Sequence, residues 1–172
     1  MSAPVFVDTN ILLYARDAAE PAKQPIASEW LAWLWRERLG RTSTQVLSEY
    51  YVNVTRKLKP GLPPAEAWED VKALLAWRPQ PVDAALLRQA RDIERDWKLG
   101  WWDSLIVAAA QAQGCETLLT EDLQGGATIG GVNIRNPFVA AATQPMAGYE
   151  VTAAARRHRG PGRPKKRTGI PL

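Results

Sequence analysis

Short apolar runs alternate with amphipathic stretches over most of the chain. The runs are rich in β-branched residues and only a few positions long, which is typical of buried strands. The stretches between them repeat apolar residues at helical spacing and are bounded by Pro or Gly. Predicted strands cover residues 3–7, 41–45, 115–120 and 132–134. A first predicted helix begins near Ile11, and five more cover residues 25–40, 45–58, 63–77, 83–98 and 101–113.

This alternation predicts an α/β fold. We expect a central parallel sheet of four to five strands with helices on both faces, in a three-layer αβα arrangement. After about residue 143 the pattern gives way to Pro, Gly and basic residues. We therefore predict one domain over residues 1–142 and a flexible, disordered basic tail over residues 143–172.

The charge divides unevenly between these two parts. The chain has 22 Lys or Arg and 18 Asp or Glu, a net charge of +4. Residues 151–172 hold seven of the cations and no acid, which leaves 15 cations against 18 acids, a net charge of −3. Such asymmetry predicts that the tail contacts a polyanion, DNA or RNA. The candidate nucleic-acid-binding residues are Arg156, Arg157, Arg159, Arg163, Lys165, Lys166 and Arg167.

The centre of the tail, GPGRPKKR, resembles the AT-hook, a short motif that lies along the minor groove of A·T-rich DNA. Proline keeps such a backbone extended, glycine allows close approach, and arginine enters the negative potential of the groove. The match is partial, because Pro161 stands where the motif usually has arginine. The alternative interpretation is a disordered basic extension that contacts any nucleic-acid backbone.

The cysteine content and the hydropathy of the chain limit the expected metal site and cellular location. The single cysteine, Cys115, excludes an internal disulfide and makes a cysteine-based zinc site unexpected. No signal-peptide pattern opens the chain, and no apolar run approaches the roughly 18 residues that span a bilayer. We expect a cytoplasmic protein that does not enter a membrane.

Two acids directly follow predicted strands. Asp8 ends the first strand, and Asp122 comes just after the strand at residues 115–120. Ligands of parallel α/β sheets gather at the carboxyl ends of the strands, so these two side chains are expected at one edge. Each acid alone is also explained as a helix cap or a turn residue.

Two further acids lie near helix starts. Glu49 falls beside Val46, at the border of the apolar stripe of its helix, and need not be buried. Its alternative role is a solvated glutamate favoured by the helix dipole. Asp103 opens the helix at residues 101–113, which is apolar all round and therefore predicted to be buried. Its alternative role is an N-cap.

Four carboxylates brought together repel one another when ionised, so a cluster of them indicates a bound divalent cation. The only histidine, His158, lies in the tail, which excludes an imidazole-based site from the domain. Oxygen ligands favour a hard ion, Mg²⁺ or Mn²⁺. Such an ion lowers the pKa of a bound water and shields charge on a transferring phosphoryl group.

The segments VFVDTNILL, STQVLSEYY, WWDSLIVAAA and LLTEDL, in this order, resemble the motifs of the PIN-domain nucleases. The resemblance is greatest to the VapC-like toxins of bacterial type II toxin–antitoxin pairs and covers about residues 3–140. It implies catalytic roles for Asp8, Glu49, Asp103 and Asp122. Asp8 and Asp103 would be the principal metal ligands, while Glu49 and Asp122 complete the pocket through waters or a second ion.

The resemblance also implies an activity and partners. The protein would be a metal-dependent endoribonuclease in which a metal-activated water, rather than a covalent intermediate, attacks an RNA phosphodiester. Its partners would be a second copy of itself and a small antitoxin. In the first motif, Thr9 and Asn10 take the hydroxyl and amide positions, and either Ser43 or Thr44 would point into the site.

Other classes fit less well. A haloacid-dehalogenase-like phosphatase needs a second acid two positions after Asp8, where Asn10 stands. A receiver domain needs a phosphorylatable aspartate on a middle strand and a late lysine, and neither is evident. The remaining alternative is a nucleic-acid-binding module with a catalytically decayed PIN core and an AT-hook-like tail, although the intact set of four acids argues against decay.

Overall fold

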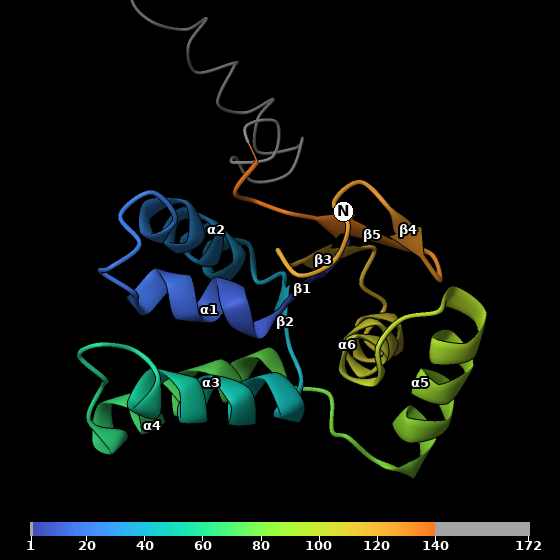
Figure 1. The fold of residues 1–172 in the computed structure, drawn as a ribbon, viewed down its shortest axis with the longest axis horizontal. Coiled ribbons are helices and arrows are strands. Elements are labelled where there is room, and N and C mark those ends of the chain that lie inside the picture. The colour runs from blue at the N-terminus through green and yellow to red at the C-terminus, as the bar shows by residue number, and fades with distance from the viewer. Residues whose placement is uncertain (1, 140–172) are drawn as a thin grey trace, which may run out of the picture.

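A five-stranded sheet runs through the middle of the molecule, whose computed structural model describes residues 2–139 (Figure 1). The strand order is β2-β1-β3-β5-β4. The strands are β1 (Val5–Val7), β2 (Gly40–Arg41), β3 (Thr117–Leu119), β4 (Thr128–Ile129) and β5 (Val132–Arg135). The helices are α1 (Thr9–Arg16), α2 (Gln24–Glu37), α3 (Thr44–Arg56), α4 (Pro64–Leu74), the short 3-10 helix η1 (Leu75–Trp77), α5 (Ala84–Trp97) and α6 (Trp101–Ala112).

The parallel strands bring the ends of β1 and β3 together. Val5 of β1 lies opposite Gly40 of β2 on one side and Thr117 of β3 on the other. The ladder continues one residue past β1, where the backbone N–H of Asp8 donates to the Leu119 carbonyl at 3.1 Å. Residues that follow these two strands are therefore neighbours at the carboxyl edge of the sheet.

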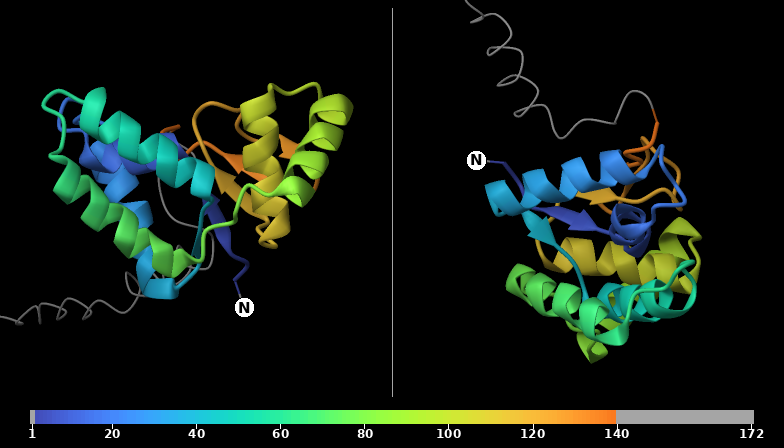
Figure 2. Two further views of the ribbon diagram at one scale, coloured as in Figure 1. Left: turned by 90° about the horizontal axis from the view of Figure 1, so that it is seen from below. Right: turned by 90° about the vertical axis from the view of Figure 1, so that its left-hand side faces the viewer.

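Helices cover both faces of the sheet, as predicted (Figure 2). α2 lies over one face and α6 over the other, with α5 packed on the outer side of α6. α1 packs against α2 and α3, and α3 in turn packs against α4. The α/β fold with helices on both sides of the sheet is confirmed.

The core contains the sheet and its covering helices. All three residues of β1 are fully buried, and α6 is buried from Ser104 to Ala110, as its all-round apolar sequence predicts. On α2, Trp30 and Trp33 are also buried, with their rings edge to face at 5.7 Å between centroids. This burial keeps the sheet rigid beneath the residues at its carboxyl edge.

Three strands, β1, β3 and β5, match the prediction to within two residues at each end, and two strands differ from it by more. β2 ends at Arg41 because Ser43 caps α3, accepting a hydrogen bond from the Val46 N–H at 3.3 Å. β4 was not predicted and pairs antiparallel with β5, so the sheet is mixed rather than wholly parallel. The turn between β4 and β5 uses Gly130 and Gly131, both with positive φ, which glycine adopts without strain.

Among residues 2–139, none of the helices has the length and apolar character needed to cross a membrane. The predicted domain boundary at residue 142 and the predicted basic tail lie outside the described residues.

Candidate active site

Asp8 lies at the junction of β1 and α1 and is 7% exposed. It is the N-cap of α1, and its Oδ1 accepts a hydrogen bond from the Thr9 N–H at 2.7 Å. The Thr120 hydroxyl, which follows β3, donates to its Oδ2 at 2.7 Å. Asp8 is thus a helix cap and also a buried carboxylate at the carboxyl edge of the sheet, so the two interpretations of this residue hold together.

Glu49 reaches the same edge from α3. The Thr9 hydroxyl donates to its Oε2 at 2.9 Å, and the Gln45 side-chain amide donates to its Oε1 at 2.9 Å. Thr9 therefore contacts Glu49 through its side chain and Asp8 through its backbone. These contacts hold Glu49 beside the first motif and leave it half-buried, in agreement with its position at the border of the apolar stripe.

Asp103 approaches from the first turn of α6. The N-cap of this helix is Gly100, whose backbone is extended, so the interpretation of Asp103 as an N-cap is wrong. Asp103 instead occupies the third helical position, and none of the described residues forms a hydrogen bond with its carboxylate. A half-buried carboxylate without a donor is available to bind a cation.

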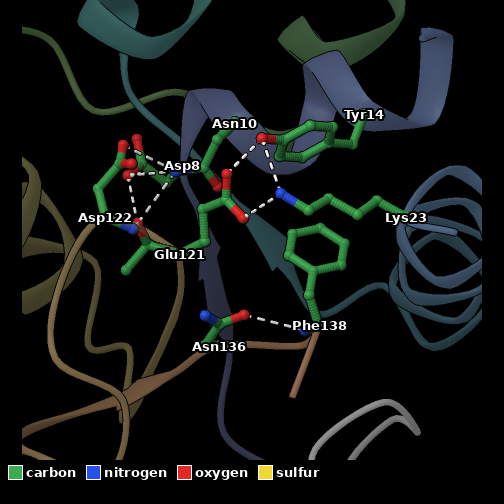
Figure 3. A network of polar contacts seen from close by, with 9 residues as sticks. Asp8, Asn10, Tyr14, Lys23, Glu121, Asp122, Asn136 and Phe138 are labelled. Carbon is green, nitrogen blue, oxygen red and sulfur yellow. Dashed lines mark hydrogen bonds and ion pairs between the residues drawn. The ribbon is translucent and has the colours of Figure 1, made fainter. Parts of the chain in front are cut away.

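Asp122 completes the group from the loop after β3. The side-chain amide of Asn10 donates to Asp122 Oδ2 at 2.9 Å, to Thr120 Oγ1 at 3.2 Å and to Asp8 Oδ2 at 3.5 Å. Figure 3 shows Asp8, Asn10 and Asp122 facing one another across this amide. Asn10 thereby links the acids that follow β1 and β3, which accounts for an amide at this position of the first motif.

The acids influence one another electrostatically. Burial, together with the negative charges of Asp122 and Glu49, raises the pKa of Asp8 to about 6, although hydrogen bonds from Thr120 and Thr9 oppose the rise. Burial and the same two carboxylates also raise the pKa of Asp103. The structure therefore brings all four predicted acids into one negatively charged region, where a cation would stabilise the ionised forms.

The oxygen donors of this region suit a hydrated divalent ion. Within residues 2–139, no three His, Cys, Asp or Glu side chains are grouped closely enough to hold an ion by themselves. Mg²⁺, however, needs only one or two carboxylates when waters fill its other positions. Asn10 Oδ1 is buried and has no hydrogen-bond partner, so it offers a further oxygen to a ligand or its water. Carboxylates with raised pKa values beside an orphaned oxygen fit a hydrated hard cation.

Ser43 and Thr44 have separate roles. Ser43 is buried and uses its hydroxyl to cap α3. Thr44 is exposed, accepts a hydrogen bond from the Val82 N–H at 3.3 Å, and lines a cavity that also contains Glu49. Thr44 is therefore the one of the pair that faces the neighbourhood of the site.

A second polar network anchors the loop that carries Asp122. Lys23 Nζ donates to Glu121 Oε2 at 2.7 Å and to the Tyr14 hydroxyl at 3.0 Å, and that hydroxyl donates to the Glu121 carboxylate (Figure 3). This network was not predicted, because it joins residues far apart in the chain. Thr120 was not predicted either, although a polar residue directly after a buried strand was a signal for it. The seven basic tail residues lie outside the described part of the chain.

Fold and site together define an α/β protein with an acidic centre at the carboxyl edge of a mostly parallel sheet. The model of the PIN domain family matches residues 5–124, and the chain belongs to this family. Among curated proteins none matches it.

Three solved structures share the fold. A toxin–antitoxin complex from Klebsiella pneumoniae aligns with a TM-score of 0.57 and 21% identity over 79% of this chain and 98% of the other. The Mycobacterium tuberculosis sarcin–ricin loop cleaving toxin VapC20 aligns with a TM-score of 0.51 and 24% identity over 66% of this chain and 86% of the other. FitAB bound to the IR36 DNA fragment aligns with a TM-score of 0.59 and 21% identity over 78% of this chain and 96% of the other. At these sequence identities the similarity shows a shared fold alone.

Proposed function

We propose that the protein is a divalent-metal-dependent endoribonuclease and the toxin of a toxin–antitoxin pair. The observation that carries the proposal is the convergence of Asp8, Glu49, Asp103 and Asp122, one from each of the four PIN-like motifs, on one edge of the sheet. The raised pKa values of Asp8 and Asp103 support the same interpretation, because a site that disfavours its own ionised acids gains most from a cation.

Asp8 and Asp103 would hold Mg²⁺ or Mn²⁺, with Asn10 Oδ1 as a further acceptor. When bound, the ion supplies a water of lowered pKa and shields the phosphoryl charge. Thr120 and Thr9 fix the Asp8 carboxylate in place by hydrogen bonds, so that it does not need to reorganise. Glu49 and Asp122 would orient waters around the ion, each already held by a side-chain amide, that of Gln45 or of Asn10.

Incubation of the purified protein with total RNA, with and without Mg²⁺ or Mn²⁺, tests the activity. Asp8→Asn and Asp103→Asn should each abolish metal-dependent cleavage, because Asn keeps the shape of the side chain but loses its charge. The matched control is Asp92→Asn, at an aspartate on α5 that is 64% exposed and pairs with Arg95. Cleavage by either site variant at the rate of the wild type would show that the assigned site is wrong.

Metal binding distinguishes the proposed nuclease from the alternative, a nucleic-acid-binding module with a decayed nuclease core. A titration with Mn²⁺ should show binding to the wild type and to Asp92→Asn, and loss of binding in Asp8→Asn. Absence of Mn²⁺ binding by the wild type, together with tight RNA binding, would favour the nucleic-acid-binding module instead.

The toxin assignment rests on the toxin-like motifs and on the toxin–antitoxin neighbours. It implies a cytoplasmic protein with a small antitoxin as partner and a second copy of the chain in the assembly. Expression of the chain alone should slow the growth of a bacterial host, and Glu49→Ala should relieve this effect. Equal growth at matched protein levels would remove the toxin assignment without affecting the nuclease assignment.

A further inference from the structure

An open cavity adjoins the acidic site on the side of α3. Its volume is about 550 Å³, within the roughly 300–1,000 Å³ of ordinary ligand pockets. Glu49 lines the cavity and also accepts a hydrogen bond from Thr9, the residue after Asp8, so the cavity adjoins the acid cluster. Thr44, Gln45 and Ser48 form a polar wall on α3, while Val82 and Trp102 contribute apolar surface.

Trp102 is unusual within this cavity. It is 66% exposed, more than any other large hydrophobic side chain among residues 2–139. It precedes Asp103 directly in the first turn of α6, so its position is tied to that of a candidate metal ligand. An indole left open to water costs hydrophobic free energy, and the core does not use this ring. A tryptophan so placed is suited to contact a ligand.

The chemistry of the cavity favours a nucleobase. Aromatic side chains beside a nucleic-acid path bind bases by stacking, which tolerates any sequence because every base has a π-face. The wall on α3 offers hydroxyl oxygens and the amide of Gln45 to a base edge or a ribose. The Thr44 and Ser48 hydroxyls donate to backbone carbonyls and can still accept, and the Gln45 amide retains a second hydrogen and its oxygen. The lining contains one charged residue, Glu49, which is negative, so the cavity is unsuited to a phosphate. The phosphate would instead lie on the side of Glu49 that faces the other acids.

We propose that Trp102 stacks on a base next to the scissile phosphate and that the cavity is a nucleobase subsite of the enzyme. The inference rests on the proposed ribonuclease function and adds to it the means by which the RNA strand is held. Trp102 acts here as a substrate-binding residue, while the acids perform the chemistry.

Steady-state cleavage of a single-stranded RNA by Trp102→Ala and Trp102→Phe tests the role. The Ala variant should raise KM about 5- to 150-fold, the range expected for loss of one base–aromatic stack, with a smaller change in kcat. The Phe variant should restore most of the affinity. The matched control is Trp68→Ala, at an α4 tryptophan that is 50% exposed and does not line the cavity. An unchanged KM in Trp102→Ala would overturn the proposal.

Binding measurements give a test that does not depend on cleavage. In an Asp8→Asn background, RNA dodecamers carrying one abasic nucleotide at successive positions are compared for binding by fluorescence anisotropy. One position should weaken binding in the Trp102 protein and should have no further effect once Trp102→Ala is present. If the loss of binding from Trp102→Ala simply added to the loss from the abasic nucleotide at every position, the proposed subsite would be overturned. This result would hold even if the wild type proved not to cleave RNA.

Sedimentation of the same variants excludes two other occupants. A loss of dimer mass in Trp102→Ala, without a change in RNA affinity, would assign the surface to a second copy of the chain. RNA affinity insensitive to Trp102→Ala, combined with weaker binding of a co-expressed small protein partner, would assign it to that partner. Either result would overturn the base-stacking proposal, whereas absence of cleavage by the wild type alone would count against the ribonuclease function only.

Discussion

Replacing Asp8 with Asn should stabilise the protein in the absence of metal. In the folded state the pKa of Asp8 rises from 3.8 to about 6, chiefly through burial. A carboxyl group whose pKa is raised by folding binds its proton more tightly in the folded state. Stability is therefore lost as the pH rises from 3.8 through about 6. Asn carries no charge at any pH, so the variant avoids this loss.

The magnitude follows from the pKa values and the contacts of the side chain. At about pH 7.5 the ionised carboxylate costs the folded state about 3 kcal/mol, and at about pH 4.5 about 1 kcal/mol. Asn keeps an oxygen for the Thr9 N–H but replaces the oxygen that accepts from Thr120, at a cost of about 1 kcal/mol. The net gain is about 2 kcal/mol near neutral pH and about zero at the lower pH.

Thermal unfolding followed by circular dichroism in EDTA measures the effect. A gain of about 2 kcal/mol raises Tm by roughly 4–8 °C in a domain of this size. We expect that difference at about pH 7.5 and its disappearance at about pH 4.5. Saturating Mn²⁺ should reverse the order, because the ion stabilises only the protein that binds it. A Tm difference independent of pH would refute the assignment of the penalty to the charge on Asp8.

Two other predictions concern packing and the tail. Gly40→Ala should destabilise the protein by about 1–3 kcal/mol in urea denaturation, because the added Cβ would lie 2.3 Å from the ring of Trp77, which is buried. An unchanged denaturation midpoint would show that the ring shifts freely. Deletion of residues 151–172 should weaken RNA binding and flatten its salt dependence, since every phosphate bound by the tail contributes about −0.7 to the slope of log K against log salt. Cleavage at saturating RNA should be nearly unchanged, and an equal salt slope in the two proteins would exclude an electrostatic role of the tail.

Much of the fold was predictable because local signals agreed with the global packing. β1 is a continuous apolar run, and β5 alternates buried and exposed residues as a strand with one buried face does. Pro64 and Gly100 mark helix starts that the structure retains. β4 could not be predicted, since its two β-branched residues, Thr128 and Ile129, are too few to show a strand pattern and pair only because a turn returns the chain to β5. The length of β2 depended on whether Ser43 continued the strand or capped the helix, which periodicity does not decide.

The candidate site was predictable at the level of its acids. Asp8 and Asp122 follow strands, and parallel pairing then requires them to be close. The hydrogen bonds that hold the acids were not predictable, because the Thr120–Asp8 and Asn10–Asp122 pairs each join residues 112 positions apart. The start of α6 after Gly100 was predicted, but the alternative role of Asp103 as its N-cap rested on the preference of aspartate for that position, and the extended backbone at Gly100 shows that the glycine is the N-cap.

The shortness of the two outer strands has a consequence for assembly. β2 and β4 lie at the two edges of the sheet and contain two residues each. Edge strands expose unpaired N–H and C=O groups that can recruit a strand from another chain. Shortly after β2, Ser43 forms a parallel β-bridge with Gln80, so part of the backbone that follows this strand is already paired. The sheet therefore offers little template for edge-to-edge aggregation, and a protein that binds this domain must engage it through helix surfaces and side chains rather than by adding a strand.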